Sequence, residues 1–147
     1  LLYWWPKITG KLYNETAAKV SFGFVFAGFN AVFIAQFIMG SRGMPRRYYD
    51  YVPEFRPYHA FSTYGSWILA VGFFILAGVL IQSLRKGAKS PPNPWGSAGF
   101  EWNTASPPIF SNFAETPVIT RGPYDYHEAT EEELFDGFPE DFKKTES

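Results

Sequence analysis

The distribution of apolar and polar positions divides the chain into two long uncharged stretches and the polar segments around them. Residues 20–40 form an uncharged run of 21 residues, and residues 60–84 form another of 25. A helix rises about 1.5 Å per residue, so either run can cross a hydrocarbon core of about 30 Å. We therefore expect an all-α membrane protein with two complete transmembrane helices, at about residues 15–40 and 60–84.

The ends of the first helix carry their own signals. Asn14 is a favourable N-cap, and Glu15 follows it in the first turn, where a carboxylate complements the helix dipole. Gly43 and Pro45 lie just beyond the apolar run and are expected to end the helix. The loop to the second helix is then assigned to residues 41–59.

Two kinds of residue recur along the first helix. Small residues at every fourth position are expected to let another helix approach closely, as is usual in lipid. A neighbouring line of phenylalanines either faces lipid and adjacent helices or borders a flat cofactor. Asn30 and Gln36 need hydrogen-bond partners away from lipid. We expect Asn30 to bond to another helix, while Gln36 is a candidate cofactor contact. The small residues are Gly23, Ala27, Ala31 and Ala35, and the phenylalanines are Phe22, Phe26, Phe29, Phe33 and Phe37.

Polar and irregular segments flank the two spans. Residues 1–5 are apolar and aromatic, and we expect them to end a preceding transmembrane helix. Pro, Gly and Lys in residues 5–11 predict an exposed turn within a cytoplasmic loop of residues 6–14. Residues 85–147 are polar and proline-rich, which predicts an irregular cytoplasmic tail; residues 131–135 are a candidate amphipathic helix in its solvated acidic end.

The basic residues predict the orientation of the spans. Three lysines precede the first span and three basic residues follow the second, so the positive-inside rule places both groups in the cytoplasm and the loop outside. The outer loop nevertheless carries four arginines against two acids, Asp50 and Glu54. We interpret this imbalance as a sign of an anionic partner outside the chain. The cytoplasmic basic residues are Lys7, Lys11, Lys19, Arg85, Lys86 and Lys89, and the loop arginines are Arg42, Arg46, Arg47 and Arg56.

Arg46 and Arg47 are the leading candidates for binding that anion. A guanidinium group binds planar carboxylates in a bidentate manner, and Pro45 fixes the backbone ahead of the pair. On composition alone, lipid phosphates or the acids of the loop are alternative partners. A net charge of −1 gives no sign of nucleic-acid binding, and a chain without cysteine has neither disulfides nor thiolate metal sites.

A series of motifs in this chain closely resembles the C-terminal part of subunit I of the heme-copper oxidases. The resemblance extends to about Tyr126, and residues 121–126 (RGPYDY) are more similar to bacterial than to mitochondrial members. It implies the end of the tenth helix, the eleventh and twelfth helices of a twelve-helix bundle, and the cytoplasmic tail. The motifs are residues 4–11 (WWPKITGK), 14–15 (NE), 28–30 (GFN), 43–51 (GMPRRYYDY), 93–96 (NPWG), 101–102 (EW), 106–108 (SPP) and 112–113 (NF).

The resemblance also implies an activity and a role for the loop. The complete subunit would reduce O₂ to water with electrons from cytochrome c and pump protons, using low-spin and high-spin heme A and copper. Arg46 and Arg47 match the arginines that bind the heme propionates, and the candidate cofactor contact of Gln36 would then be with a heme. Asp50 matches a calcium or sodium ligand of some members, although a loop Asp equally caps a turn or pairs with Arg47. The implied partners are the remainder of subunit I, subunits II and III, and lipid, in the bacterial cytoplasmic membrane or, alternatively, the mitochondrial inner membrane.

The chain departs from the family in one motif and lacks the metal ligands. Residues 35–40 (AQFIMG) are without the Pro and His found in many relatives, although that His is not a metal ligand. The only histidines, His59 and His127, are expected to be surface residues. We therefore expect the fragment alone to be inactive. A quinol oxidase of the same superfamily and a two-span accessory subunit without catalytic role are the alternatives.

Overall fold

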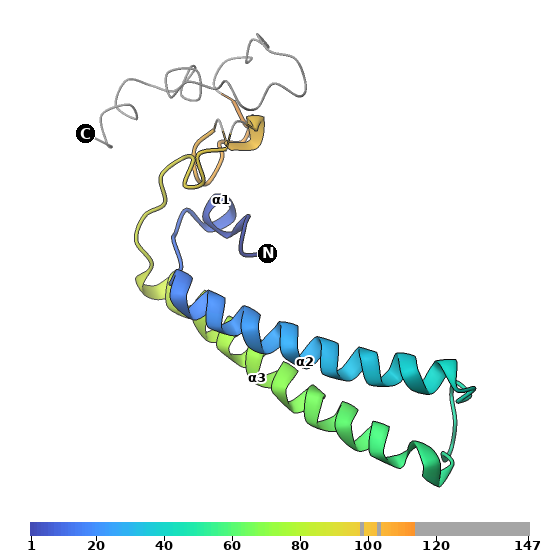
Figure 1. The fold of residues 1–147 in the computed structure, drawn as a ribbon. Helices are drawn as coiled ribbons and strands as arrows, with labels where there is room; N and C mark the ends of the chain where they lie inside the picture. Colours follow the sequence, from blue (N-terminus) through green and yellow to red (C-terminus); the bar gives the residue numbers. More distant parts are fainter. Residues whose placement is uncertain (98, 103, 114–147) are drawn as a thin grey trace. The chain divides into compact units, whose positions relative to one another are not determined.

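The computed structural model describes residues 1–97, 99–102 and 104–113. These residues form helices and irregular segments and contain no β-strand longer than an isolated bridge. The chain divides into two compact units, Tyr13–Arg85 and Leu1–Leu12 with the segment from Lys86. The expectations for residues 121–126, His127 and residues 131–135 lie outside the described residues. The elements are α1 (Trp5–Thr9), α2 (Glu15–Ser41), the 3₁₀ helix η1 (Pro53–Phe55), α3 (Arg56–Lys86) and the 3₁₀ helix η2 (Phe100–Trp102) (Figure 1).

The expected pair of long apolar helices is confirmed, since α2 and α3 are each long and apolar enough to cross a membrane. Asn14 caps α2 as expected, because its side-chain oxygen accepts a hydrogen bond from the Ala17 N–H at 2.9 Å. Glu15 forms an ion pair with Lys19 one turn later, at 2.8 Å. The second helix begins at Arg56, earlier than expected, because the turn of η1 leads directly into it.

The two helices pack through positions that alternate in steps of three and four. This spacing averages 3.5 residues and is typical of a coiled-coil seam, in which facing side chains interlock along the whole contact. A hydrogen bond joins the two helices within this seam: Ser21 Oγ donates to the Gly72 carbonyl at 2.9 Å. The buried seam residues are Ser21, Gly28, Val32, Ala35 and Met39 on α2, and Ser62, Gly65, Gly72, Val79 and Ser83 on α3.

The line of small residues predicted at every fourth position is confirmed as a contact with α3 only in part. Ala35 is buried and Ala31 faces Gly65, whereas Gly23 and Ala27 are exposed. The reason is geometric. A helix turns about 100° per residue, so each step of four drifts about 40° around the axis, while a seven-residue repeat returns almost to its starting direction.

Glycines set how closely α2 and α3 approach. A Cβ at Gly28 would lie against the backbone of Leu69, with its Cα at 2.7 Å. A Cβ at Gly72 would lie 2.8 Å from the backbone nitrogen of Val25, and one at Gly65 would lie 2.8 Å from the Ala31 Cβ. Backbone atoms cannot move aside as a flexible side chain can, so the hairpin depends on glycine at these points.

The second unit joins the N-terminal segment to the segment after α3. Leu12 N–H donates to the Ala88 carbonyl and Ser90 N–H donates to the Gly10 carbonyl, each at 2.8 Å. Trp102 is completely buried, and its ring stacks on Trp4 with centroids 5.5 Å apart. The Trp102 indole thus buries its whole apolar surface while its N–H still finds a hydrogen-bond partner in the Tyr3 hydroxyl.

The sequence interpretation of this region was wrong in one respect. Residues 5–11 were expected to form an exposed turn, but Trp5–Thr9 is helical and both Pro6 and Lys7 are buried. Lys7 is buried because carbonyl groups far away in the sequence replace the water that a lysine normally requires. Gly10 ends α1 in the left-handed conformation (φ 66°), as expected of a glycine at a helix C-terminus.

Candidate anion-binding loop

The end of α2 is built as a glycine-terminated helix cap. Gly43 has φ 84°, in the region that favours glycine. Its N–H donates to the Gly40 carbonyl, and Met44 N–H donates to the Met39 carbonyl, both at 3.1 Å. This pair of hydrogen bonds is the Schellman arrangement, which satisfies the last carbonyls of a helix and turns the chain away. The predicted end of α2 is confirmed, and the arginine pair follows it immediately.

Arg46 and Arg47 lie on an exposed part of the loop. Arg47 has φ 56°, a left-handed conformation that a residue with a side chain adopts at a cost of about 1 kcal/mol. In the described part of the chain, neither arginine forms an ion pair, because the single ion pair present joins Glu15 to Lys19. The acids of the loop therefore leave both guanidinium groups available to an external anion.

Asp50 contacts the backbone beside it. Its Oδ1 accepts a hydrogen bond from the N–H of Tyr51 at 2.7 Å, and in the described part of the chain it forms no ion pair with Arg47. No group of three or more His, Cys, Asp and Glu side chains able to hold a metal ion occurs among the described residues. A cation bound by Asp50 would need further ligands from outside them, so this role stays a prediction.

His59 was predicted to be a surface residue, and the structure shows it only partly exposed. Its ring is half-buried and lies against Tyr51, with centroids 4.1 Å apart, and near Tyr48 at 5.6 Å. Its Nε2 is buried and has no hydrogen-bond partner among the residues that the structure describes. The two tyrosines return from the loop onto the start of α3, a contact that the sequence pattern did not indicate.

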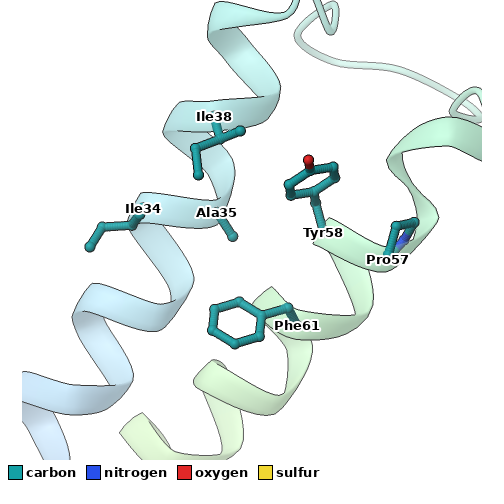
Figure 2. Close-up of a pocket in the computed structure, with 6 residues that line it drawn as sticks. All are labelled: Ile34, Ala35, Ile38, Pro57, Tyr58 and Phe61. Atoms are coloured by element: carbon teal, nitrogen blue, oxygen red, sulfur yellow. The ribbon is translucent and has the colours of Figure 1, made fainter.

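Where α2 and α3 diverge toward the loop (Figure 1), an apolar cavity of about 320 Å³ opens between them. Figure 2 shows Tyr58 and Phe61 on α3 across the cavity from Ala35 and Ile38 on α2, while the Ile34 side chain is directed away from the two rings. The Arg42 guanidinium lies over the Tyr58 ring, 5.1 Å from its centroid. This cation–π contact links the two helix ends beside the loop. The cavity is lined by Ile34, Ala35, Ile38, Pro57, Tyr58 and Phe61.

The polar residues inside α2 have partners that differ from those expected. Asn30 was expected to bond to another helix, but its amide donates to the Phe26 carbonyl of its own helix at 2.8 Å. Gln36 instead makes the contact between helices, since its Nε2 donates to Ser62 Oγ at 3.3 Å. The structure does not bring Gln36 into the arginine loop, and its contact with a heme stays a prediction. All six phenylalanines of α2 are exposed, the five of the predicted line among them.

Sequence reasoning missed Lys7 and Trp102, which the structure places at the centre of the second unit. Burial of the ammonium lowers the pKa of Lys7 to about 8, and the negative charge of Glu101 partly opposes this effect. A signal was present in the tryptophans and the tyrosine of residues 3–5 and in the tryptophans of the tail. Their number predicts burial, but it does not identify the partners.

The sequence of this chain is similar to those of known oxidase subunits. The family model for cytochrome c and quinol oxidase polypeptide I matches residues 1–68. Cytochrome c oxidase subunit 1 of Synechocystis sp. is 41% identical over 88% of this chain and 23% of its own length. Heme-copper oxidase subunit I+III of Aeropyrum pernix is 41% identical over 82% of this chain and 15% of its own length. The probable quinol oxidase subunit 1 of Staphylococcus epidermidis is 40% identical over 80% of this chain and 19% of its own length.

The matches include the features on which the loop depends. Residues 1–68 contain α1, α2, the Gly43 helix cap, the arginine pair and the start of α3. The chain spans less than a quarter of the length of these relatives. It belongs to the subunit I family of the heme-copper oxidases, and it matches one part of such a subunit.

Proposed function

We propose that this chain is the C-terminal part of the catalytic subunit of a proton-pumping terminal oxidase, and that its outer loop anchors heme propionates. The observation that carries the proposal is the exposed pair Arg46 and Arg47, which has no carboxylate partner in the described part of the loop. Two adjacent guanidinium groups are suited to two carboxylates, and such pairs are stronger than neutral hydrogen bonds. The loop joins two helices that are long enough to span a membrane, so the pair lies at a membrane surface.

The fit to heme is one of charge and shape. When bound, the low-spin and high-spin heme A groups supply electron transfer and oxygen binding, while Arg46 and Arg47 hold and neutralise the propionates. The Gly43 helix cap sets where the arginine pair begins. No group of three or more His, Cys, Asp and Glu side chains able to hold a metal ion occurs among the described residues. In this proposal the ligands of the heme iron and of copper come from the remainder of subunit I. The fragment alone is then inactive.

Two further residues have weaker assignments within this proposal. Gln36, on the loop half of α2, is a candidate for contact with a heme edge in addition to its hydrogen bond to Ser62. Asp50 is a candidate ligand of a calcium or sodium ion at the outer surface, with its remaining ligands supplied by other parts of the subunit. Subunits II and III and lipid are the further partners, in a bacterial cytoplasmic membrane.

Cytochrome c is the proposed electron donor, and quinol is the alternative. The alternative rests on the Staphylococcus epidermidis relative, whose name is that of a quinol oxidase and whose identity to this chain is nearly the same as that of the cytochrome c oxidases. Oxygen uptake by the purified complex separates the two. We expect uptake with reduced cytochrome c and little with a reduced quinol. Uptake with quinol alone would favour the alternative, and uptake with neither would remove both.

The orientation of the loop can be tested with single cysteines in the complete subunit. Ser41→Cys, at the exposed end of α2, should react with an impermeant thiol reagent applied from the outside of intact cells. Lys89→Cys should react only after the cytoplasmic membrane is opened. Lys89 suits this purpose because it is exposed, whereas Ser90 is 5% exposed and its cysteine would be protected on either side. The reverse labelling pattern would contradict the proposed orientation and the propionate assignment with it.

A further inference from the structure

The contacts that hold Lys7 take no part in the packing of α2 against α3 or in the proposed heme contacts. It lies on α1 with 5% of its surface exposed. Its Nζ donates to the Thr104 carbonyl at 2.5 Å and to the Pro92 carbonyl at 2.8 Å, with a longer contact of 3.5 Å to the Ala105 carbonyl. A primary ammonium has three N–H groups. Three carbonyl oxygens from one distant segment therefore match its full set of donors.

An aromatic face completes the surroundings of this ammonium. Nζ lies 5.1 Å from the centroid of the Trp102 ring, within the range of a cation–π contact. Hydrogen bonding and stacking fix that ring, because Trp102 Nε1 donates to Tyr3 Oη at 2.8 Å and the ring stacks on Trp4. The Pro92 carbonyl also accepts from Ser106 Oγ at 3.2 Å. The carbonyls and the ring are thus held in place by contacts other than those to Lys7.

Neutral groups, and not a carboxylate, hold the charge. Among the described residues, no Asp or Glu side chain forms an ion pair with Lys7; Glu101 on η2 acts on it only from a greater distance. Tyr3 is the titratable side chain of the N-terminal segment in the same cluster. At pH 7 the side chain carries its proton, since burial lowers its pKa only to about 8. Carbonyl dipoles and an indole face are the groups that bind alkylammonium ions in proteins.

We propose that the Pro92, Thr104 and Ala105 carbonyls and the Trp102 ring form a binding site for a primary alkylammonium ion, and that Lys7 is its tethered ligand. By filling the site, Lys7 fastens the segment after α3 to α1. The neighbouring backbone hydrogen bonds, from Leu12 N–H to the Ala88 carbonyl and from Ser90 N–H to the Gly10 carbonyl, join the same two segments. Their exchange with solvent reports whether the segments are fastened.

The test uses hydrogen exchange of the complete subunit in its purified membrane complex at pH 7. Lys7→Met keeps an unbranched side chain up to the position of Cε but has no ammonium, and Lys7→Ala removes the atoms equivalent to propylammonium. Each loses charge-assisted hydrogen bonds, so we expect the Leu12 and Ser90 amides to exchange at least about tenfold faster in both variants. Lys89→Ala, which removes an exposed lysine from the same segment, should leave both rates unchanged.

Chemical rescue distinguishes a binding site from simple packing. Propylammonium chloride should return the Lys7→Ala variant toward the wild-type rates. It should not rescue Lys7→Met, in which the methionine side chain occupies the space. Tetramethylammonium chloride at the same concentration has no N–H donor and should rescue neither. Wild-type protection in Lys7→Met, or no response of Lys7→Ala to propylammonium, would overturn the proposal. If Lys7→Ala cannot be purified, wild-type exchange rates in Lys7→Met still overturn the proposal.

Discussion

Replacing either arginine of the outer loop by alanine in the complete subunit is expected to disturb a heme directly. A propionate shielded by protein is poorly solvated and needs local compensation of its charge. Removing one partner of such a pair costs roughly 3–5 kcal/mol, because the opposite charge is left uncompensated. We expect Arg46→Ala and Arg47→Ala to lower a heme midpoint potential or impair proton pumping, with failed assembly as the most severe result.

The direction of the potential shift follows from the charge. A propionate without its arginine stabilises ferric heme over ferrous heme, so the midpoint potential falls, by about 59 mV for each tenfold change in the equilibrium for one electron. A proton taken up by the propionate in place of the arginine reduces the shift. Arg46→Lys and Arg47→Lys keep the charge but lose the bidentate geometry, so their effects should be smaller than those of alanine and still measurable.

Arg56→Ala provides the matched control for these variants. Arg56 is an exposed arginine at the start of α3, so this change removes the same charge from the same outer region. Redox titration of each heme and measurement of proton pumping should give wild-type values for this variant. Wild-type values for Arg46→Ala and Arg47→Ala as well would show that neither residue holds a propionate.

Gly28→Ala is expected to be the most damaging small substitution in the hairpin. An added Cβ would lie against the backbone of Leu69, so α2 and α3 must move apart along their seam. Overpacking of this kind costs about 1–3 kcal/mol where neighbours can adjust, and more where the obstacle is backbone. We expect a lower yield of assembled complex and a lower midpoint temperature for loss of the heme spectrum.

Two other glycines of the hairpin provide matched controls for Gly28→Ala. Nothing in the described chain lies within 4 Å of a Cβ added at Gly23 on α2 or at Gly78 on α3. Alanine favours a helix over glycine by up to about 1 kcal/mol, so both substitutions should be neutral or slightly stabilising within the hairpin. If Gly28→Ala matches these controls in yield and thermal stability, the close approach at Gly28 does not limit the packing of the helices.

The sequence by itself determined the features that depend on neighbouring residues. The two spans follow from uncharged runs long enough to cross a bilayer. The cap at Asn14 and the end of α2 at Gly43 follow from side-chain and backbone preferences within one or two turns. The arginine pair was identified because four loop arginines face two acids, and the motifs that carry the family resemblance are contiguous in the chain.

The tertiary structure decided what depends on residues distant in sequence. The contact between α2 and α3 passes through Gly28 and not through Gly23. The residues in contact depend on how the two helices pack together, and not on the four-residue spacing of small residues along α2. Lys7 is buried because three backbone carbonyls, 85 to 98 residues away in the sequence, accept hydrogen bonds from its ammonium group. Composition alone predicts that a lysine stays in water. His59 is half-buried because Tyr51 returns onto α3. In each case a contact between distant segments outweighs the position that the residue would take from its local sequence. The pattern of residues along the chain does not indicate which segments come into contact.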